Sequence, residues 1–204
     1  MITLIDYGVG NIFAFQNVYK RLDIPTKIAK STEDLMDAQK LILPGVGSFD
    51  YAMIRLNNSG MREKLDELVL KKKIPVIGIC VGMQMMGNRS DEGSEEGLKW
   101  IDGDILKFDE KLIQLRTKLP HMGWNDVTPV RNHPLFGGLE KEAIFYFLHS
   151  FFFKCNNPND SIAISDYGVS FSSAVYKDNI YGIQFHPEKS HQYGEKLLHN
   201  FAML

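Results

Sequence analysis

Apolar residues in the first half of the chain form short runs, and the stretches between the runs carry them at helical spacing. The runs predict strands at Ile2–Ile5, Thr26–Ala29, Leu41–Leu43 and Val76–Ile79. Apolar residues at helical spacing predict two helices, one with Phe15, Val18, Tyr19 and Leu22 on its buried face and one with Met61, Leu65, Leu68 and Val69. A further helix is expected to begin in Ser31–Asp34. This alternation indicates a mostly parallel sheet with helices on both faces.

The second half of the chain is dominated by short β-rich runs. Strands are predicted at Ile105–Phe108, Ile144–Phe147, Phe151–Phe153, Ile162–Ser165, Ser170–Tyr176 and Ile180–Phe185, with a tight hairpin turn at Lys177–Asn179. A last amphipathic helix aligns Leu197, Phe201 and Leu204. We therefore expect an α/β fold whose second half adds a β-rich region to the central sheet.

Composition narrows the classes of protein. A chain of 204 residues with 44% hydrophobic and 24% charged residues suits one soluble domain over 1–204. A formal net charge of −2 gives no electrostatic case for nucleic acid or for an anionic membrane. The first residues read as a strand and not as a leader, and no apolar run approaches the roughly 20 residues of a membrane span. Two cysteines are too few for a disulfide framework, which favours a cytoplasmic location.

The stretch from Pro75 to Gln84 carries the strongest chemical signal. Its sequence Gly-Ile-Cys-Val-Gly has the spacing of a nucleophile elbow, with a thiol at Cys80 in place of a hydroxyl. Gly78 and Gly82 would allow the close packing that such a turn needs. A helix beginning after Cys80 would favour the thiolate. A buried, inert cysteine between two glycines is the alternative interpretation.

A second motif, Gly-Ile-Gln-Phe-His-Pro-Glu at 182–188, places His186 and Glu188 two residues apart after another predicted strand. The two motifs together resemble the signatures of class I (triad) glutamine amidotransferases. The segments Leu119–Asn125 and Pro187–Ser190 are similar to those of glutaminase subunits of imidazole glycerol phosphate synthases. The resemblance extends from Asp6–Asn11 to the last helix and implies a flavodoxin-like α/β fold.

The resemblance also implies the chemistry. Cys80 would attack the carboxamide carbon of glutamine to give a γ-glutamyl thioester, His186 would carry the proton, and Glu188 would orient the imidazole. Two backbone N–H groups, those of Val46 and Val81, would form the oxyanion hole. Further positions that match substrate-binding residues of relatives are Gly45, Gly47, Gln84, Glu92, Ser150 and Phe151. No cofactor is implied, and the remaining histidines lack metal-ligand spacing, so no metal is expected.

Other residues match positions that face a (β/α)₈ synthase partner in relatives: Asn11, Met122, Trp124, Tyr146 and Lys189. The segment Pro120–Asn125 is by itself a loop with an anchoring Trp. The resemblance thus implies a heterodimer in which ammonia passes to the partner, which forms imidazole glycerol phosphate and the carboxamide ribotide in histidine biosynthesis. The peptide between Gly45 and Gly47 is expected to rotate when the partner is loaded.

Three alternatives remain open on the sequence. The first is a paralogous subunit that supplies ammonia for amidino groups on surface sugars; genomic neighbours or growth without histidine would separate it. The second is a non-catalytic scaffold, which the intact Cys80, His186 and Glu188 disfavour. The third is a cysteine hydrolase of another amide, which Pro44–Gly47 and Gln84 disfavour. Two departures from the family pattern are Val81 in place of Leu and the segment Lys99–Gly103.

Overall fold

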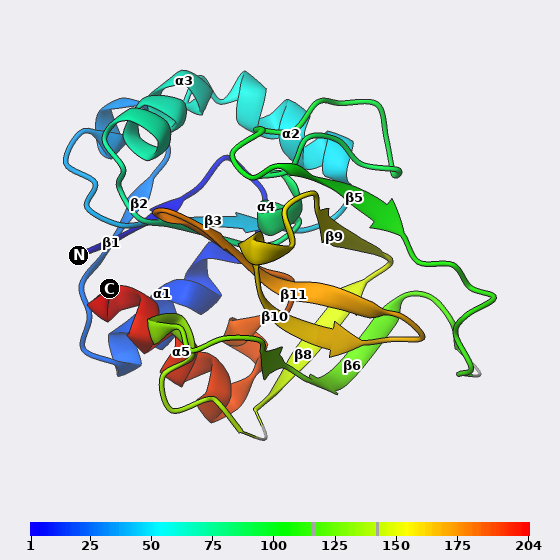
Figure 1. Cartoon of the computed structure of the whole chain (residues 1–204). Helices are drawn as coiled ribbons and strands as arrows, with labels where there is room; N and C mark the ends of the chain where they lie inside the picture. The colour runs from blue at the N-terminus through cyan, green and yellow to red at the C-terminus, as the bar shows by residue number, and fades with distance from the viewer. Residues whose placement is uncertain (116, 142) are drawn as a thin grey trace.

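A central mixed sheet separates two layers of helices (Figure 1). The computed structural model describes residues 1–115, 117–141 and 143–204. Five parallel strands form one side of the sheet, in the order β2-β1-β3-β4-β12. Their bounds are Ile2–Ile5 for β1, Thr26–Ala29 for β2, Leu41–Gly45 for β3, Val76–Cys80 for β4 and Ile180–Ile183 for β12. This is the strand order of a flavodoxin-like sheet, the fold that the family resemblance implied.

Antiparallel strands from the second half of the chain extend the sheet beyond β12. They are β5 Gly103–Lys107, β7 Thr128–Pro129, β9 Phe151–Cys155, β10 Ser161–Asp166 and β11 Ser170–Lys177. A separate two-stranded sheet pairs β6, His121–Asp126, with β8, Ile144–His149. The predicted β-rich second half is therefore confirmed, although it divides into two sheets.

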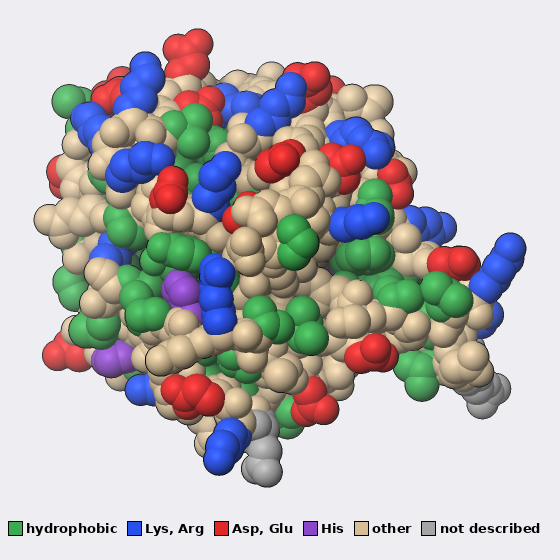
Figure 2. Space-filling view, viewed as in Figure 1, with side chains coloured by type: hydrophobic (Ala, Val, Ile, Leu, Met, Phe, Trp, Pro, Cys, Tyr) green, Lys and Arg blue, Asp and Glu red, His purple; other side chains and the backbone are tan. Residues whose placement is uncertain are grey.

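The helices lie on both faces of the sheet, with α1 and α5 on one face and α2 and α3 on the other (Figure 1). The α-helices are α1 Ile12–Arg21, α2 Phe49–Asn58, α3 Arg62–Asp66, α4 Val81–Gln84 and α5 His191–Met203. A π-helical turn, η2, follows α3 at Glu67–Lys71. The 3₁₀ turns are η1 Glu33–Leu35, η3 Pro134–Phe136, η4 Pro158–Asp160 and η5 Pro187–Lys189. Among the described residues, no helix is both long enough and apolar enough to cross a membrane. Acidic and basic side chains are both scattered over the face in Figure 2.

Three local predictions were wrong. Ser31–Asp34 leads only to the single turn η1, because the Asp34 carboxylate accepts the N–H groups of Lys30 and Ser31 and holds a compact turn. The segment Pro120–Asn125, predicted as a loop, contributes β6, because its backbone pairs with β8 in spite of its Gly and Asn. Strand β12 ends at Ile183 and not at Phe185, because the His186 N–H donates to the Tyr146 carbonyl and draws the chain toward β8.

The carboxyl ends of β3, β4 and β12 lie side by side. Gly45 is in register with Cys80, and Ile183 is in register with Ile79. In open α/β sheets, ligands bind beyond the carboxyl ends of the strands. The fold therefore brings the loops after these three strands to one edge, where Cys80, Val46 and His186 meet.

Candidate active site

Cys80 lies at the sharp turn between β4 and α4. Its backbone has φ +56° and ψ −116°, and its side chain is buried. A positive φ is uncommon for a residue with a Cβ and is sustained only where the surrounding structure imposes it. The turn fixes the Cys80 sulfur above the edge of the sheet, as the elbow spacing predicted.

The glycines around Cys80 allow backbone segments to touch. A Cβ on Gly82 would lie 2.0 Å from the Leu43 carbonyl oxygen, and a Cβ on Gly45 would lie 2.3 Å from the Gly82 nitrogen. Strand β3 and the start of α4 are therefore in direct backbone contact. Helix α4 has only one turn, so it contributes little of the helix-terminal charge that the sequence led us to expect at Cys80.

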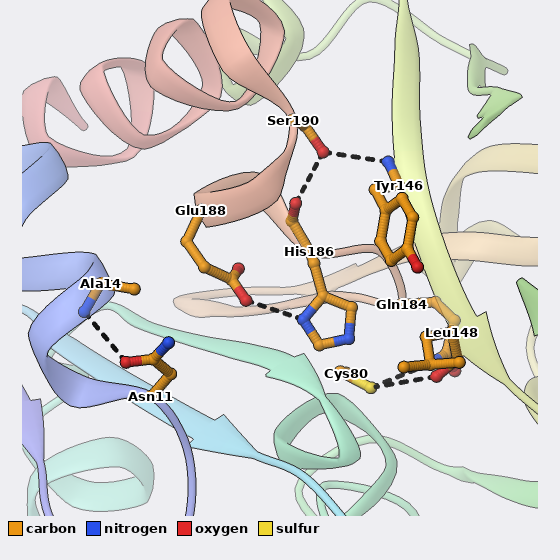
Figure 3. A network of polar contacts seen from close by, with 9 residues as sticks. All are labelled: Asn11, Ala14, Cys80, Tyr146, Leu148, Gln184, His186, Glu188 and Ser190. Atoms are coloured by element: carbon orange, nitrogen blue, oxygen red, sulfur yellow. Dashed lines mark hydrogen bonds and ion pairs between the residues drawn. The ribbon is translucent and has the colours of Figure 1, made fainter. Parts of the chain in front are cut away.

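His186 and Glu188 form a buried ion pair, with 2.8 Å between Nδ1 and Oε1. The other edge of the imidazole faces the Cys80 sulfur (Figure 3). Burial by itself would lower the pKa of His186, but hydrogen bonds and opposite charge from Cys80 and Glu188 outweigh burial and raise the pKa to about 10. The His186 imidazole therefore lies between the Cys80 sulfur and the Glu188 carboxyl group.

The backbone of His186 is fixed by Ser190, a residue to which the sequence analysis assigned no role. The Ser190 hydroxyl donates to the His186 carbonyl oxygen at 2.6 Å and accepts from the Tyr146 N–H at 3.0 Å (Figure 3). The His186 N–H in turn donates to the Tyr146 carbonyl oxygen at 2.8 Å. The only feature of the sequence that could have indicated this role is the position of Ser190 directly after Pro187-Glu188-Lys189.

Two glutamines connect the Cys80 sulfur to strand β9. The Gln184 amide nitrogen lies 3.8 Å from the sulfur, and the Gln184 carbonyl accepts from the Gln84 amide nitrogen at 3.0 Å. The Gln84 amide also donates to the Phe151 carbonyl at 3.2 Å. Gln84, which the resemblance selected, thus shapes the floor of the site, and Gln184 was missed although it lies in the second motif.

A cavity of about 310 Å³ opens above the Cys80 sulfur. That volume suits a small metabolite. Every residue predicted as catalytic, oxyanion-binding or substrate-binding lines this cavity, except Gly45 and Glu188. The full lining is Val46, Gly47, Cys80, Val81, Gln84, Glu92, Pro120, Leu148, His149, Ser150, Phe151, His186 and Lys189. The structure thus gathers residues from positions 46 to 189 around one space.

The segment after β3 forms an open wall of this cavity. Val46 follows Gly45, the register partner of Cys80, and lines the same cavity as Val81. Its side chain is 43% exposed, and Gly47 has φ +81°, a conformation that disfavours a Cβ. The Tyr7 hydroxyl donates to the Pro44 carbonyl at 2.7 Å and anchors the strand just before this segment.

Two buried histidines support the wall at Ser150 and Phe151. His149 Nδ1 donates to the Phe151 carbonyl at 2.8 Å, and His149 Nε2 lies 2.9 Å from His121 Nδ1. Burial lowers the pKa of His121 to about 4 and that of His149 to about 3, so both rings are neutral. The sequence analysis gave neither residue a role in the site, and their pairing depends on the β6–β8 register.

The residues that match partner-facing positions are exposed or half-buried. Met122 is 62% exposed and Trp124 is 45% exposed, and the Trp124 ring stacks on His191. Lys189 lies over the Tyr146 ring at 5.6 Å, and exposed Asn11 caps α1 by accepting from the Ala14 N–H. A second cavity of about 630 Å³ borders Met122 and Trp124 and contains none of the triad residues.

The second cysteine, Cys155, lies in a different environment from Cys80. It lies in β9, and its sulfur contacts the Ser172 hydroxyl at 3.8 Å. Burial raises the pKa of Cys155 to about 11, which keeps it a thiol at neutral pH. Among the described residues, no group of three or more His, Cys, Asp or Glu side chains is arranged to hold a metal ion.

Comparison with known proteins agrees with this geometry. Residues 3–204 match the family model of class-I glutamine amidotransferases. The imidazole glycerol phosphate synthase subunit HisH of Bdellovibrio bacteriovorus is 57% identical over 99% of both chains, and that of Leptospira interrogans is 50% identical over the whole of both chains.

Solved structures show the same fold. A putative GMP synthase component from Thermoplasma acidophilum, 25% identical, gives a TM-score of 0.72 over 98% of this chain and 90% of its own. A crystal structure of a glutamine amidotransferase, 17% identical, gives a TM-score of 0.76 over 99% of this chain and 97% of its own. The chain belongs to the class-I glutamine amidotransferases, in the group that contains the HisH subunits.

Proposed function

We propose that this chain is the glutaminase subunit of an imidazole glycerol phosphate synthase, hydrolysing L-glutamine to glutamate and ammonia. The observation that carries the proposal is the Cys80 sulfur on its strained turn, facing an imidazole that Glu188 holds at 2.8 Å. The names of the HisH relatives support the choice of synthase and disfavour the amidino-sugar alternative. Cys80, His186 and Glu188 are the proposed catalytic residues.

The chemistry follows from the triad. The Cys80 sulfur adds to the carboxamide carbon of glutamine, and His186 holds the thiol proton. The tetrahedral intermediate collapses when His186 gives that proton to the leaving nitrogen, so ammonia departs and a γ-glutamyl thioester remains. Water then attacks the thioester with His186 as base, and glutamate and the Cys80 thiol are released.

Negative charge develops on the carboxamide oxygen in both steps. We assign the N–H groups of Val46 and Val81 as its donors, because both residues line the cavity with Cys80 and Gly45, which precedes Val46, is the register partner of Cys80. Gly45 is proposed to keep the two segments in contact and Gly47 to let the Val46 peptide turn. The geometry supports an oxyanion hole with one fixed donor and one adjustable donor.

The glutamine backbone is proposed to bind at the other end of the cavity. The Glu92 carboxylate would receive the ammonium group, and the backbone of Ser150 and Phe151 would hold the carboxylate end. Gln84 would hold the floor through the Phe151 carbonyl. All four residues line the same 310 Å³ space as Cys80, which supports this assignment.

The partner is proposed to be a (β/α)₈ synthase that uses the ammonia in histidine biosynthesis, in the cytoplasm. Exposed Trp124 and Met122 would anchor the interface, with Asn11, Tyr146 and Lys189 around it. Aromatic and Met side chains at this exposure are typical of interface anchors.

Reconstitution with the purified synthase tests the function. The expected result is imidazole glycerol phosphate formed from the partner's ribotide substrate with either glutamine or ammonium salt as nitrogen donor. Omitting this chain should abolish only the glutamine-driven reaction. If the complex forms product from ammonium but never from glutamine, the proposed glutaminase function is wrong.

A further inference from the structure

Hydrogen bonds join the first turn of α2 to the acidic loop at 90–96. Asp50 accepts two of these bonds, and the proposed chemistry gives it no role. We propose that Asp50 is a positioning residue that holds Glu92 at the cavity and thereby sets recognition of the substrate's ammonium group. The inference rests on the proposed function, because it names what positions one of the substrate-binding residues.

The Asp50 carboxylate binds the loop backbone with both oxygens. Oδ1 accepts the Glu95 N–H at 3.0 Å, and Oδ2 accepts the Ser94 N–H at 2.9 Å. Gly93 packs directly on the same carboxylate, since a Cβ at this position would lie 2.1 Å from Oδ1. An anchor with two charge-assisted bonds therefore begins two residues after Glu92.

Glu92 is held from the opposite side by the same helix. Its Oε2 accepts the Phe49 N–H, the first N–H of α2, at 2.7 Å. Its own N–H donates to the Ser90 hydroxyl at 3.1 Å. Phe49 and Asp50 are adjacent, so the helix binds the loop through one donor and one acceptor residue. Each contact fixes the loop in the register that the other requires.

The structure distinguishes Glu92 from its acidic neighbours, which the sequence alone did not. Among Asp91, Glu92, Glu95 and Glu96, Glu92 is the one that lines the cavity with Cys80. Asp91 lies 3.5 Å from Arg89, and Glu96 lies 3.0 Å from Lys99. Within residues 1–115, 117–141 and 143–204, Glu92 Oε1 forms no hydrogen bond with protein, so this oxygen is available to a ligand cation.

Loss of Asp50 should therefore affect one part of the substrate. The Ser94 and Glu95 N–H groups would turn to water, and the loop would gain conformational freedom that glutamine has to remove on binding. The carboxamide end of the substrate, held near Cys80 and Val81, would meet an unchanged surface. We therefore expect the ammonium group to contribute less to substrate binding, with little change in the rate of the chemical steps.

The experiment compares glutamine with glutaramate, which keeps the carboxamide and the carboxylate but lacks the amino group, as substrates of the assembled complex. In Asp50→Ala, kcat/KM for glutamine should fall roughly tenfold, mainly through KM. The same constant for glutaramate should stay within about twofold. Asp50→Asn keeps one carbonyl acceptor and should fall between wild type and Asp50→Ala.

Two further variants isolate the mechanism. Glu96→Gln removes a charge from the same loop without touching Asp50 and should leave the ratio of the two constants unchanged. Glu92→Gln should lower the ratio, and adding Asp50→Ala to it should lower the ratio no further, because both changes remove one interaction.

The outcomes separate the two proposals. If wild type hydrolyses glutamine but Asp50→Ala lowers kcat/KM equally for both substrates, or leaves the ratio as it was, the positioning role is wrong and the glutaminase function stands. If Asp50→Ala does not fold, Asp50→Asn with the same ratio as wild type overturns the role equally. A wild-type complex that hydrolyses neither substrate overturns the proposed function itself.

Discussion

The two sides of the cavity differ in how firmly they are held. On the inner side, the His186 and Glu188 side chains are 5% and 4% exposed, and Ser190 and Tyr146 fix the backbone of His186. On the outer side, Val46 is 43% exposed on a segment that ends in a positive-φ glycine. The side chains proposed to react are therefore buried, whereas Val46, proposed as an oxyanion donor, lies on a connecting segment.

This difference indicates where control can act. A buried ion pair moves only if packed elements move, whereas a connecting segment can change conformation at small cost. The acidic loop is an intermediate case, since it is exposed yet fixed by Asp50 and Phe49. We therefore expect changes on the inner side to remove catalysis and changes on the outer side to tune it.

The largest effect is expected from Cys80→Ala. Without the nucleophile no thioester forms, so glutaminase turnover of the complex should drop by at least about a thousandfold. Ammonium-driven synthesis should survive, because the fold accepts a smaller side chain at this position. Cys155→Ala is the matched control and should keep glutaminase activity, since Cys155 lies in β9 away from the cavity. Near-normal glutamate release by Cys80→Ala would disprove the assignment.

Within the ion pair, His186→Asn should remove turnover about as completely as Cys80→Ala, because it eliminates the proton carrier. Glu188→Gln should be milder by roughly one to two orders of magnitude, since it keeps the shape but loses the charge that stabilises the imidazolium. Steady-state glutamate release by the two variants measures the order. A fully active His186→Asn protein would refute the triad.

The outer side should provide the next largest effect. If the Val46 N–H can turn away from the cavity, one of two oxyanion donors is lost, which typically costs roughly 10²–10³ in turnover. Glutaminase turnover should therefore rise at least about a hundredfold from the chain alone to the complex with the partner's ribotide substrate. The complex without the ribotide supplies the intermediate measurement. Equal turnover in all three states would indicate a fixed oxyanion hole.

The inner ion pair should also make stability depend on pH. Contacts with Cys80 and Glu188 raise the pKa of His186 from 6.5 to about 10. A raised pKa stabilises the fold fully below about pH 6.5, and that stabilisation is lost as the pH rises toward 10. The free energy of unfolding of wild type relative to His186→Asn should thus decrease by at least about 1 kcal/mol between these limits. Denaturant titrations measure it, and an increase with pH would contradict it.

The smallest effect is expected at the proposed interface. Trp124→Ala should weaken binding of the synthase by more than about 1 kcal/mol, because a half-exposed Trp buries a large area on association. Leu70→Ala, at a similarly exposed residue in the turn before β4, should leave the affinity unchanged. Calorimetry with the purified partner gives both values. Equal affinities for wild type and Trp124→Ala would show that Trp124 only packs within the chain and does not anchor the interface.

Local sequence patterns were enough to predict strands β1 to β4 and the turn at Cys80, although helix α2 was missed. Runs such as Leu41–Leu43 and Val76–Ile79 are buried on both faces, so they are apolar throughout, and Gly82 has to lack a Cβ because Leu43 lies against it. Each of these signals depends on residues within one strand or turn. The motif at His186 and Glu188 could be recognised for the same reason, because the two residues are only two positions apart in the sequence.

Contacts between distant segments, in contrast, became visible only in the folded chain. Sequence analysis assigned no role to His149 and His121, and their hydrogen bond follows from the pairing of β6 with β8. Ser190 became important because β12 ends early and the chain turns to Tyr146. Asp50 reaches Ser94 only through the packing of a helix on a loop over 40 residues away. Such contacts produce no repeating pattern in the sequence. A hydrogen bond between distant segments depends on a single partner far along the chain, and the residues around it need not follow any spacing.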